Sequence, residues 1–97
     1  MSEPDIQKEI TDRKGRYLIV HEGGGESDLT YSILSPARVI ADHTVVDPAH
    51  EGQGVGLRLV NALIADAEAQ GFKIIPLCPY VNAQRRKHPE WAEYFDV

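Results

Sequence analysis

The sequence predicts a mixed α/β fold built on a mostly antiparallel sheet, and three observations support this prediction. Three segments rich in strand-forming residues follow one another between residues 16 and 46. An amphipathic helical segment comes next, after a glycine-rich loop, and a short apolar segment follows it. Strands joined by short turns run antiparallel, whereas strands joined through a helix run parallel. The expected order of elements is therefore β-β-β-α-β-α.

The first two strands are predicted from residue type and alternation. Residues 16–22, with the sequence RYLIVHE, contain mostly strand formers, and the GGGE that follows suits a flexible hairpin turn. Residues 27–34 alternate in the way expected of a strand with one buried face. That buried face would carry Leu29, Tyr31 and Ile33.

The third strand, residues 37–46, leads directly into the glycine-rich loop. A Ser-Pro pair at residues 35–36 separates it from the second strand. A regular pleat would place four of its side chains on one face: Val39, Ala41, His43 and Val45. A β-bulge near the end of the strand would instead turn His43 in another direction.

The central helix is predicted from the spacing of its apolar residues. These recur at the i, i+3, i+4, i+7, i+8 and i+11 positions of one helical face: Gly56, Leu59, Val60, Leu63, Ile64 and Ala67. Gly71 stands where a C-terminal helix cap is expected. Residues 72–78 return as a short strand, in which Pro76 favours an edge position or a bulge. The remaining segment predicts one or two short helices interrupted near Pro89.

Length and composition indicate one domain in a reducing compartment. The 97 residues are expected to form a single domain, residues 1–97, in which residues 1–15 are partly flexible. The single cysteine, Cys78, excludes an internal disulfide. The net charge of −5 disfavours a nucleic-acid partner, and the absence of a signal peptide or long apolar run disfavours a membrane partner. We therefore expect a cytoplasmic protein.

The glycine-rich loop, EGQGVG at residues 51–56, has two interpretations. Glycines before a helix allow backbone amides to approach an anion at the positive end of the helix dipole. Alternatively, they only meet the needs of turn geometry and close packing between helix and sheet. The spacing fits neither Gly-x-x-x-x-Gly-Lys-Ser/Thr nor Gly-x-Gly-x-x-Gly, because the third glycine comes one residue early for the latter. Three alternate glycines between a strand and a helix favour an anion site.

The string HEGQGVGLRLV, residues 50–60, resembles the acyl-CoA diphosphate loop of the GNAT superfamily of N-acetyltransferases. That loop is written Gln/Arg-x-x-Gly-x-Gly/Ala, so Gly54 and Gly56 match its glycines and Glu51 replaces its Gln or Arg. The chain is also similar to a small stand-alone subgroup in three further strings: His43-Thr44, Cys78-Pro79-Tyr80 and His88-Pro89. The resemblance implies a minimal version of the GNAT fold.

The same resemblance implies transfer of an acetyl group from acetyl-CoA, as co-substrate, to a small amine or a protein amine. The backbone at the end of the third strand would hold the pantetheine arm, at Thr44, Val45 and Val46. Backbone amides would hold the diphosphate, at Gln53, Gly54, Val55, Gly56 and Leu57. The basic run at residues 85–87 begins with Arg85, which either contacts the nucleotide phosphates or belongs to a solvated helix face.

Four residues are candidates for the chemistry of acetyl transfer. His43 is the natural base, because imidazole titrates near neutral pH, although a packed or surface histidine fits the same sequence. Cys78 is a covalent acetyl carrier, a thiol acid toward the leaving group, or a small buried residue. Tyr80, like Tyr94, would either protonate the leaving thiolate or pack at the core or its rim.

The leading prediction is a small N-acetyltransferase that acts on an unidentified amine as a monomer or homodimer. A non-catalytic acyl-CoA-binding or regulatory module is the first alternative, because Glu51 departs from the family motif and no early helices flank the acceptor. A structural domain whose glycines serve packing is the second. His21 and His50 have no constellation around them, and no grouped ligands predict a metal site.

Overall fold

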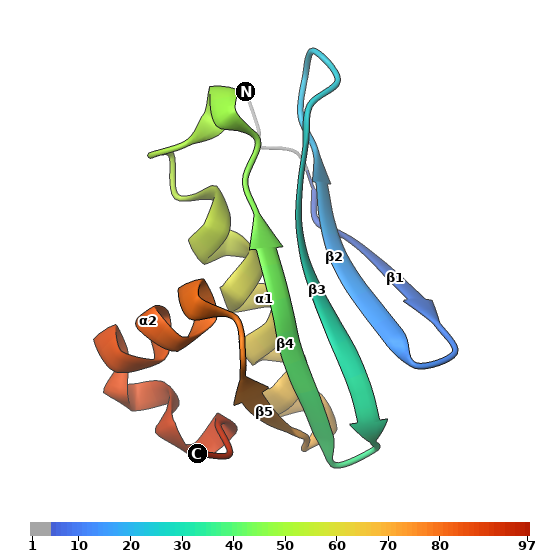
Figure 1. The fold of residues 1–97 in the computed structure, drawn as a ribbon, viewed down its shortest axis with the longest axis vertical. Coiled ribbons are helices and arrows are strands. Elements are labelled where there is room, and N and C mark those ends of the chain that lie inside the picture. The colour runs from blue at the N-terminus through green and yellow to red at the C-terminus, as the bar shows by residue number, and fades with distance from the viewer. Residues whose placement is uncertain (1–4) are drawn as a thin grey trace.

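The computed structural model describes residues 5–97, in which a five-stranded sheet packs against helices. In chain order the strands, α-helices and short 3-10 helices (η) are β1 (Gln7–Thr11), β2 (Lys14–Val20), β3 (Glu26–Ser35), β4 (Arg38–Val45), η1 (Pro48–His50), α1 (Val55–Gln70), β5 (Lys73–Pro76), α2 (Pro79–Lys87) and η2 (Pro89–Tyr94). The strands lie side by side in sequence order and are antiparallel, except that β4 and β5 are parallel (Figure 1). The predicted mixed, mostly antiparallel sheet is confirmed.

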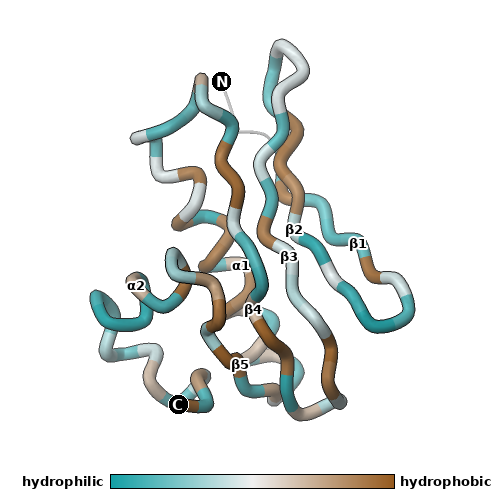
Figure 2. Tube along the Cα trace, in the orientation of Figure 1, coloured by the Kyte–Doolittle hydropathy of each residue, from teal (hydrophilic) through white to brown (hydrophobic). Residues whose placement is uncertain are grey.

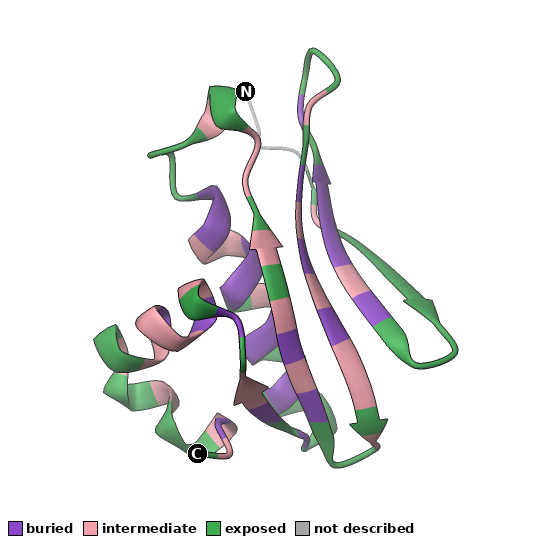
Figure 3. Ribbon diagram, in the orientation of Figure 1, coloured by how far each residue is buried: buried purple, intermediate pink, exposed green. Residues whose placement is uncertain are grey.

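The structure contains a strand, β1, that the sequence did not predict. The expected order of elements is therefore corrected by one additional strand at its start. The sequence predicts partial flexibility over residues 1–15, whereas residues 7–11 pair with β2 from Gln7↔Leu18 to Thr11↔Lys14. All five β1 residues are exposed, and the strand is mostly hydrophilic (Figure 2, Figure 3). It therefore lacks the apolar alternation from which a strand is predicted. Residues 1–4 lie outside the described part of the chain.

Helix α1 packs its apolar face against one side of the sheet. The predicted stripe is confirmed, because the buried residues of α1 are Val55, Gly56, Leu59, Val60, Leu63, Ile64 and Ala67 (Figure 3). They share one core with side chains from the middle of the sheet, among them Tyr17, Ile19, Leu29 and Tyr31. Gly71 ends the helix at φ +79°, and its amide donates to the Ala67 carbonyl at 2.9 Å. The predicted glycine cap is therefore also confirmed.

The other side of the sheet, which we call the bare face, carries no helix in residues 5–97. Both α2 and η2 contact α1, so the helices gather on the α1 side, and none crosses in front of β2, β3 or β4 in Figure 1. Polar side chains lie on the bare face: Ser32 donates to Asp42 at 2.7 Å, and Arg16 lies 3.4 Å from Asp28. The bare face thus carries polar side chains that a ligand or partner can reach.

The C-terminal segment extends the edge of the sheet beside β5. As predicted, two short helices follow β5, and the second begins at Pro89. Phe95 then pairs with Ile74 in an isolated parallel bridge. The Arg38 guanidinium donates to the Asp96 carboxylate at 2.6 Å. These contacts fasten the end of the chain to β4 and β5.

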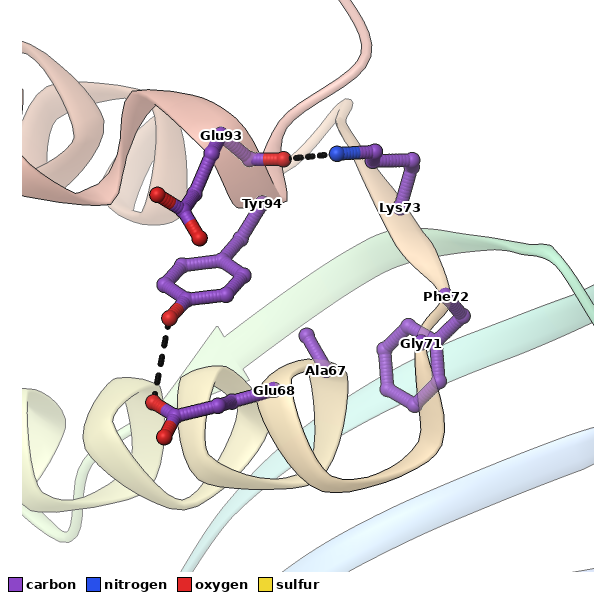
Figure 4. A pocket seen from close by; sticks show the side chains of 7 residues that line it. All are labelled: Ala67, Glu68, Gly71, Phe72, Lys73, Glu93 and Tyr94. Carbon is purple, nitrogen blue, oxygen red and sulfur yellow. Dashed lines mark hydrogen bonds between the residues drawn. The ribbon is translucent and has the colours of Figure 1, made fainter.

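A cavity of about 220 Å³ lies between the C-terminal end of α1 and η2 (Figure 4). Tyr94 Oη donates to a Glu68 carboxylate oxygen at 3.0 Å, and the Lys73 ammonium donates to the Glu93 carbonyl (Figure 4). These two bonds hold η2 against α1 and β5. Tyr94 therefore lies at the opposite end of α1 from the glycine loop, which removes it as a proton donor there.

A buried tyrosine on β2 is bonded to a carboxylate on α1. Tyr17 Oη donates to an Asp66 oxygen at 2.6 Å, and Lys8 Nζ on β1 lies 2.8 Å from the same oxygen. Burial, together with the bond to Asp66, raises the pKa of the Tyr17 phenol above its ordinary value of 10.0. The folded chain therefore keeps this proton at alkaline pH values at which the unfolded chain releases it.

We expect the free energy of unfolding to fall as the pH rises above the ordinary tyrosine pKa of 10.0. There the unfolded chain loses the Tyr17 proton and the folded chain keeps it, which costs about 1.4 kcal/mol per pH unit. Tyr17→Phe should flatten this alkaline slope by one proton in urea melts. At pH 7 it should destabilise the fold by about 1.5–3 kcal/mol, because charged Asp66 loses a donor. An unchanged slope would mean that Tyr17 ionises normally in the folded chain.

Candidate functional site

The three alternate glycines of the loop have two different structural roles. Gly52 and Gly54 both have φ +78°, and a Cβ at either position would meet nothing within 4 Å. They allow a left-handed backbone that other residues adopt only with strain. At Gly56 a Cβ would lie 2.8 Å from the Tyr80 ring, so this glycine lets Tyr80 approach the first turn of α1. Turn geometry therefore explains two glycines, and close packing explains the third.

The N-terminus of α1 borders an open cavity. Gly54 is the N-cap residue, no side chain caps the helix, and the first helical bond runs from the Arg58 amide to the Gly54 carbonyl at 3.1 Å. The amides that precede Arg58 have no intrahelical partner and carry the positive end of the helix dipole. The cavity has a volume of about 340 Å³ and is lined by Val46, His50, Glu51, Gly52, Gly54, Val55, Gly56 and Tyr80. The free amides and the helix dipole favour an anion in this cavity, whereas the Glu51 carboxylate in its wall opposes one.

The end of β4 has no strand neighbour on the β5 side in residues 5–97. The parallel pairing stops at Ala41↔Pro76, and the Cys78 amide then donates to the Ala41 carbonyl at 2.8 Å. Beyond this bond the chain turns away into α2, whereas β4 continues toward the glycine loop (Figure 1). The backbone of β4 after Ala41 therefore presents an unpaired edge that leads to the cavity.

A β-bulge in β4 changes the direction of the side chains at its end. The register with β3 shifts after Ala41, so that Asp42 is an extra residue in the pairing. The expectation that four side chains share one face is therefore wrong: Val39 and Ala41 are buried, whereas His43 and Val45 are exposed. The structure has the alternative arrangement, in which a bulge re-aims His43, and His43 lies on the bare face.

Thr44 and Cys78 meet on the α1 side of the sheet. Thr44 lies opposite Leu29 in the pairing with β3, and its Oγ1 is 3.4 Å from Cys78 Sγ. Cys78 is only 3% exposed and is the N-cap residue of α2. The positive end of the α2 dipole therefore lies beside the sulfur and favours negative charge that develops on it.

Tyr80 connects this cysteine with the cavity. Its ring packs on Gly56 and lines the cavity, two residues after Cys78 in the first turn of α2. Burial raises the pKa of the Tyr80 phenol. The phenol therefore stays protonated at neutral pH and is available as a hydrogen-bond or proton donor.

The structure brings about half of the predicted site residues to one place. The cavity is lined by five of them: Val46, Gly54, Val55, Gly56 and Tyr80. Thr44 and Cys78, in mutual contact, precede Val46 and Tyr80 by two residues. The remaining predicted residues are absent from the cavity wall: His43, Val45, Gln53, Leu57 and Arg85. Arg85 instead donates to the Asn82 side chain at 2.9 Å, within α2.

Three lining residues were missed as site residues: His50, Glu51 and Gly52. Glu51, which is exposed, and Gly52 belong to the loop motif, and the motif alone could have included them. His50 gave no such signal, because its ring stacks on His21 from a distant part of the chain. The prediction that these two histidines have no constellation around them is wrong.

The candidate site consists of backbone amides and a few side chains. In the described part of the chain, no three His, Cys, Asp or Glu side chains are grouped in a way that could hold a metal ion. Within the same residues, neither α1 nor α2 has the length and apolar character of a transmembrane helix. The groups at or near the site are amide donors, a thiol, a phenol and histidines.

In this mixed sheet the parallel strands β4 and β5 separate beside a glycine loop and the N-terminus of α1. This arrangement is that of proteins with the acyl-CoA N-acyltransferase fold. Residues 16–94, most of the chain, match the family described as GCN5-related N-acetyl-transferase. The chain belongs to this family.

One solved structure is similar over almost the whole chain. It is the NMR solution structure of a GCN5-like protein from Staphylococcus aureus, named provisionally as an N-acetyltransferase. The two sequences are 26% identical, the TM-score is 0.73, and the match covers 99% of this chain and 91% of that chain. No curated protein matches the sequence significantly. The predicted GNAT fold is therefore confirmed by both the family and the structural neighbour.

Proposed function

We propose that this chain transfers the acetyl group of acetyl-CoA to an amine. One observation carries the proposal: the unpaired end of β4 runs between the cavity at the N-terminus of α1 and the contact of Thr44 with Cys78. A diphosphate favours free amides at a helix N-terminus. A thioester bound at the other end of this β4 segment, beside Thr44, would meet the thiol of Cys78. Membership of the N-acetyltransferase family supports this assignment of the two ends.

The cofactor would be held mainly by backbone groups. Its diphosphate would accept hydrogen bonds from the amides of residues 53–57, and its pantetheine arm would lie along β4 at residues 44–46. An extended ligand gains main-chain hydrogen bonds when it adds to an unpaired strand edge in this way. One well-placed amide donor to the thioester oxygen would lower the barrier by about 3–4 kcal/mol.

Cys78 would act at the thioester by one of two routes. In the direct route the neutral amine attacks the acetyl carbon, the bond from that carbon to the CoA sulfur breaks, and this sulfur takes a proton from Cys78, which the proton released by the new amide nitrogen then restores. In the covalent route the Cys78 thiolate attacks first, and CoA leaves as a thiol with the proton that Cys78 released. The amine then takes the acetyl group from Cys78, whose sulfur recovers a proton. Both routes require Cys78 in contact with the thioester.

His43 is the proposed base for the amine. An alkyl amine with a pKa of about 10.4 is neutral in fewer than roughly one molecule in a thousand at pH 7. His43 is exposed on the bare face, one residue before Thr44, where an amine can reach β4 without passing a helix (Figure 1). The cofactor and the amine would thus approach β4 from its two sides.

The direct test mixes the protein with acetyl-CoA and a panel of amines and measures released thiol. The panel contains small amines, polyamines, a peptide N-terminus and a lysine peptide. We expect thiol release that requires both acetyl-CoA and at least one of these amines. Binding of acetyl-CoA without release for any amine would favour a non-catalytic module. No binding and no release would contradict the proposal.

We expect Gly54→Ala to weaken acetyl-CoA binding at least about tenfold, or about 1.4 kcal/mol. Alanine at φ +78° adds roughly 1–2 kcal/mol of backbone strain. Its methyl group would also project from a residue of the cavity wall, where the diphosphate is proposed to bind. Isothermal calorimetry measures the change in dissociation constant.

Gly71→Ala is the matched control for this variant. Gly71 has φ +79° and an equally open Cβ position, but it caps the far end of α1. Both variants should lower Tm by about 4–15 °C through the same backbone strain. Only Gly54→Ala should change acetyl-CoA binding, so equal dissociation constants in the two variants would place the diphosphate elsewhere.

Composition supports a compartment and a choice of partners for the proposed enzyme. The net charge of −5 disfavours a nucleic-acid partner, and the single cysteine fits the reducing cytoplasm. The proposed enzyme is one domain, residues 1–97, acting as a monomer or homodimer. Its bare face would accept the amine substrate or a second copy of the chain.

A further inference from the structure

Two histidines from distant parts of the chain stack beside the glycine loop. His21 follows β2, whereas His50 ends η1 and lines the cavity at the start of α1. Their ring centroids are 3.8 Å apart, and their planes are inclined by 11°. The stack therefore joins the β2–β3 hairpin to the loop that precedes α1.

His21 is fixed to the sheet on its own side of the stack. It is buried, and its Nε2 lies 2.8 Å from the hydroxyl of Ser27, which is also buried. The same hydroxyl oxygen accepts the Asp47 amide at 2.8 Å. The His21 amide donates to the Gly25 carbonyl at 2.7 Å. These bonds make His21 a rigid platform for the ring that lies on it.

His50 connects this platform to the loop. Its Nδ1 is 3.3 Å from Gln53 Oε1, and its Nε2 is 3.8 Å from an Asp47 carboxylate oxygen. Its ring face lies on His21. The His50 ring therefore ties loop residues on both of its sides to the sheet.

The glycines contribute no side-chain contact of their own. Gly52 and Gly54 are exposed, and a Cβ at either position would meet no atom within 4 Å. Glycine also loses more conformational entropy on ordering than any other residue. A loop of this kind without an anchor would have to be ordered whenever a ligand binds, and this ordering weakens binding.

We propose that His21 and His50 are positioning residues, which hold the glycine loop in its anion-binding conformation before the ligand arrives. This inference rests on the proposed function of the loop as the diphosphate site of acetyl-CoA. Neither histidine takes part in the chemical step. Their stacked rings act on cofactor affinity by removing part of the ordering cost of the loop.

The test compares His50→Ala, which removes the ring, with His50→Phe, which keeps a flat ring on His21. His88→Ala is the matched control, because His88 also stacks on an aromatic ring, that of Trp91, with centroids 4.2 Å apart, at the end of α2. Melting curves first establish that all three variants fold.

The first measurement is the NMR order parameter of the Gly52 and Gly54 amides in the protein without ligand. We expect His50→Ala to lower these values below about 0.6, the range of flexible backbone. His50→Phe and His88→Ala should keep the values of the unmodified protein. Because no ligand is present, this result does not depend on the proposed function.

The second measurement is the dissociation constant of coenzyme A by calorimetry. We expect His50→Ala to weaken binding roughly five- to tenfold, and the other two variants to stay within about twofold. The rate of thiol release at saturating acetyl-CoA should not change in His88→Ala.

The outcomes separate the two proposals. Unchanged order parameters in His50→Ala would overturn the positioning role, whether or not coenzyme A binds. A mobile loop with unchanged affinity would overturn the link between the stack and binding. If the unmodified protein does not bind coenzyme A, the proposed function fails, and the order parameters still decide whether the stack holds the loop.

Discussion

Replacing Cys78 by alanine should lower the rate of acetyl transfer at least about a hundredfold. The Cys78 sulfur lies 3.4 Å from Thr44 Oγ1, beside the unpaired edge of β4, so both proposed routes require it at the thioester. Loss of a nucleophile or of a positioned acid costs roughly 10²–10⁴ in rate. The KM for acetyl-CoA should change by less than about threefold, because the diphosphate site remains intact. Initial rates of thiol release measure both quantities.

Cys78→Ser is the control for packing at this position. The hydroxyl can keep a hydrogen bond with Thr44, so this variant should keep its stability while its turnover remains low. Mass spectrometry of the protein incubated with acetyl-CoA alone then separates the two routes. An acetyl group on Cys78 indicates the covalent carrier, and its absence indicates the direct route. Full turnover in Cys78→Ala would exclude both roles and leave Cys78 as a buried packing residue.

His43→Gln should lower kcat about a hundredfold, because the amine loses its general base. Glutamine keeps the approximate size and hydrogen bonding of histidine but does not accept a proton at neutral pH. His43 is exposed, so the variant should fold normally, and its KM for acetyl-CoA should stay within about twofold. Initial rates of thiol release at saturating acetyl-CoA and amine measure kcat.

His88→Gln provides the matched surface histidine for this experiment. His88 lies at the end of α2, where its Nδ1 is 3.0 Å from a Glu90 carboxylate oxygen, and it is not proposed to contact either substrate. This variant should keep the rate of the unmodified protein. An unchanged rate in His43→Gln would show that water or another side chain accepts the proton.

Burial explains which parts of the fold could be predicted from the sequence. In β3 and α1, one face packs in the core, so Leu29 and Tyr31 alternate along the strand and Leu59 and Leu63 recur along the helix. Strand β1 packs no residue in the core. It is held by its pairing with β2 and by the ion pair of Lys8 with Asp66 on α1. Backbone pairing of exposed residues leaves no hydropathy pattern, so this strand was not predicted.

In the candidate site, features set by the local sequence could be predicted, whereas features set by contacts between distant residues could not. The loop motif predicts that Gly54 and Gly56 lie at the start of a helix, and they are the N-cap and a first-turn residue of α1, because this depends on the local path of the backbone. The side of β4 on which His43 lies depends on the bulge at Asp42, which is set by pairing with β3. The stack of His50 on His21 likewise depends on tertiary packing and cannot be inferred from spacing.

The most direct measurement is an NMR titration of the ¹⁵N-labelled protein with acetyl-CoA. We expect the largest amide shifts at residues 53–57, with a second group at residues 44–46 on the unpaired edge of β4. The Gly71 amide, which donates to Ala67 at the other end of α1, should move little. Absence of shifts at millimolar acetyl-CoA, or shifts concentrated away from the start of α1, would contradict the account.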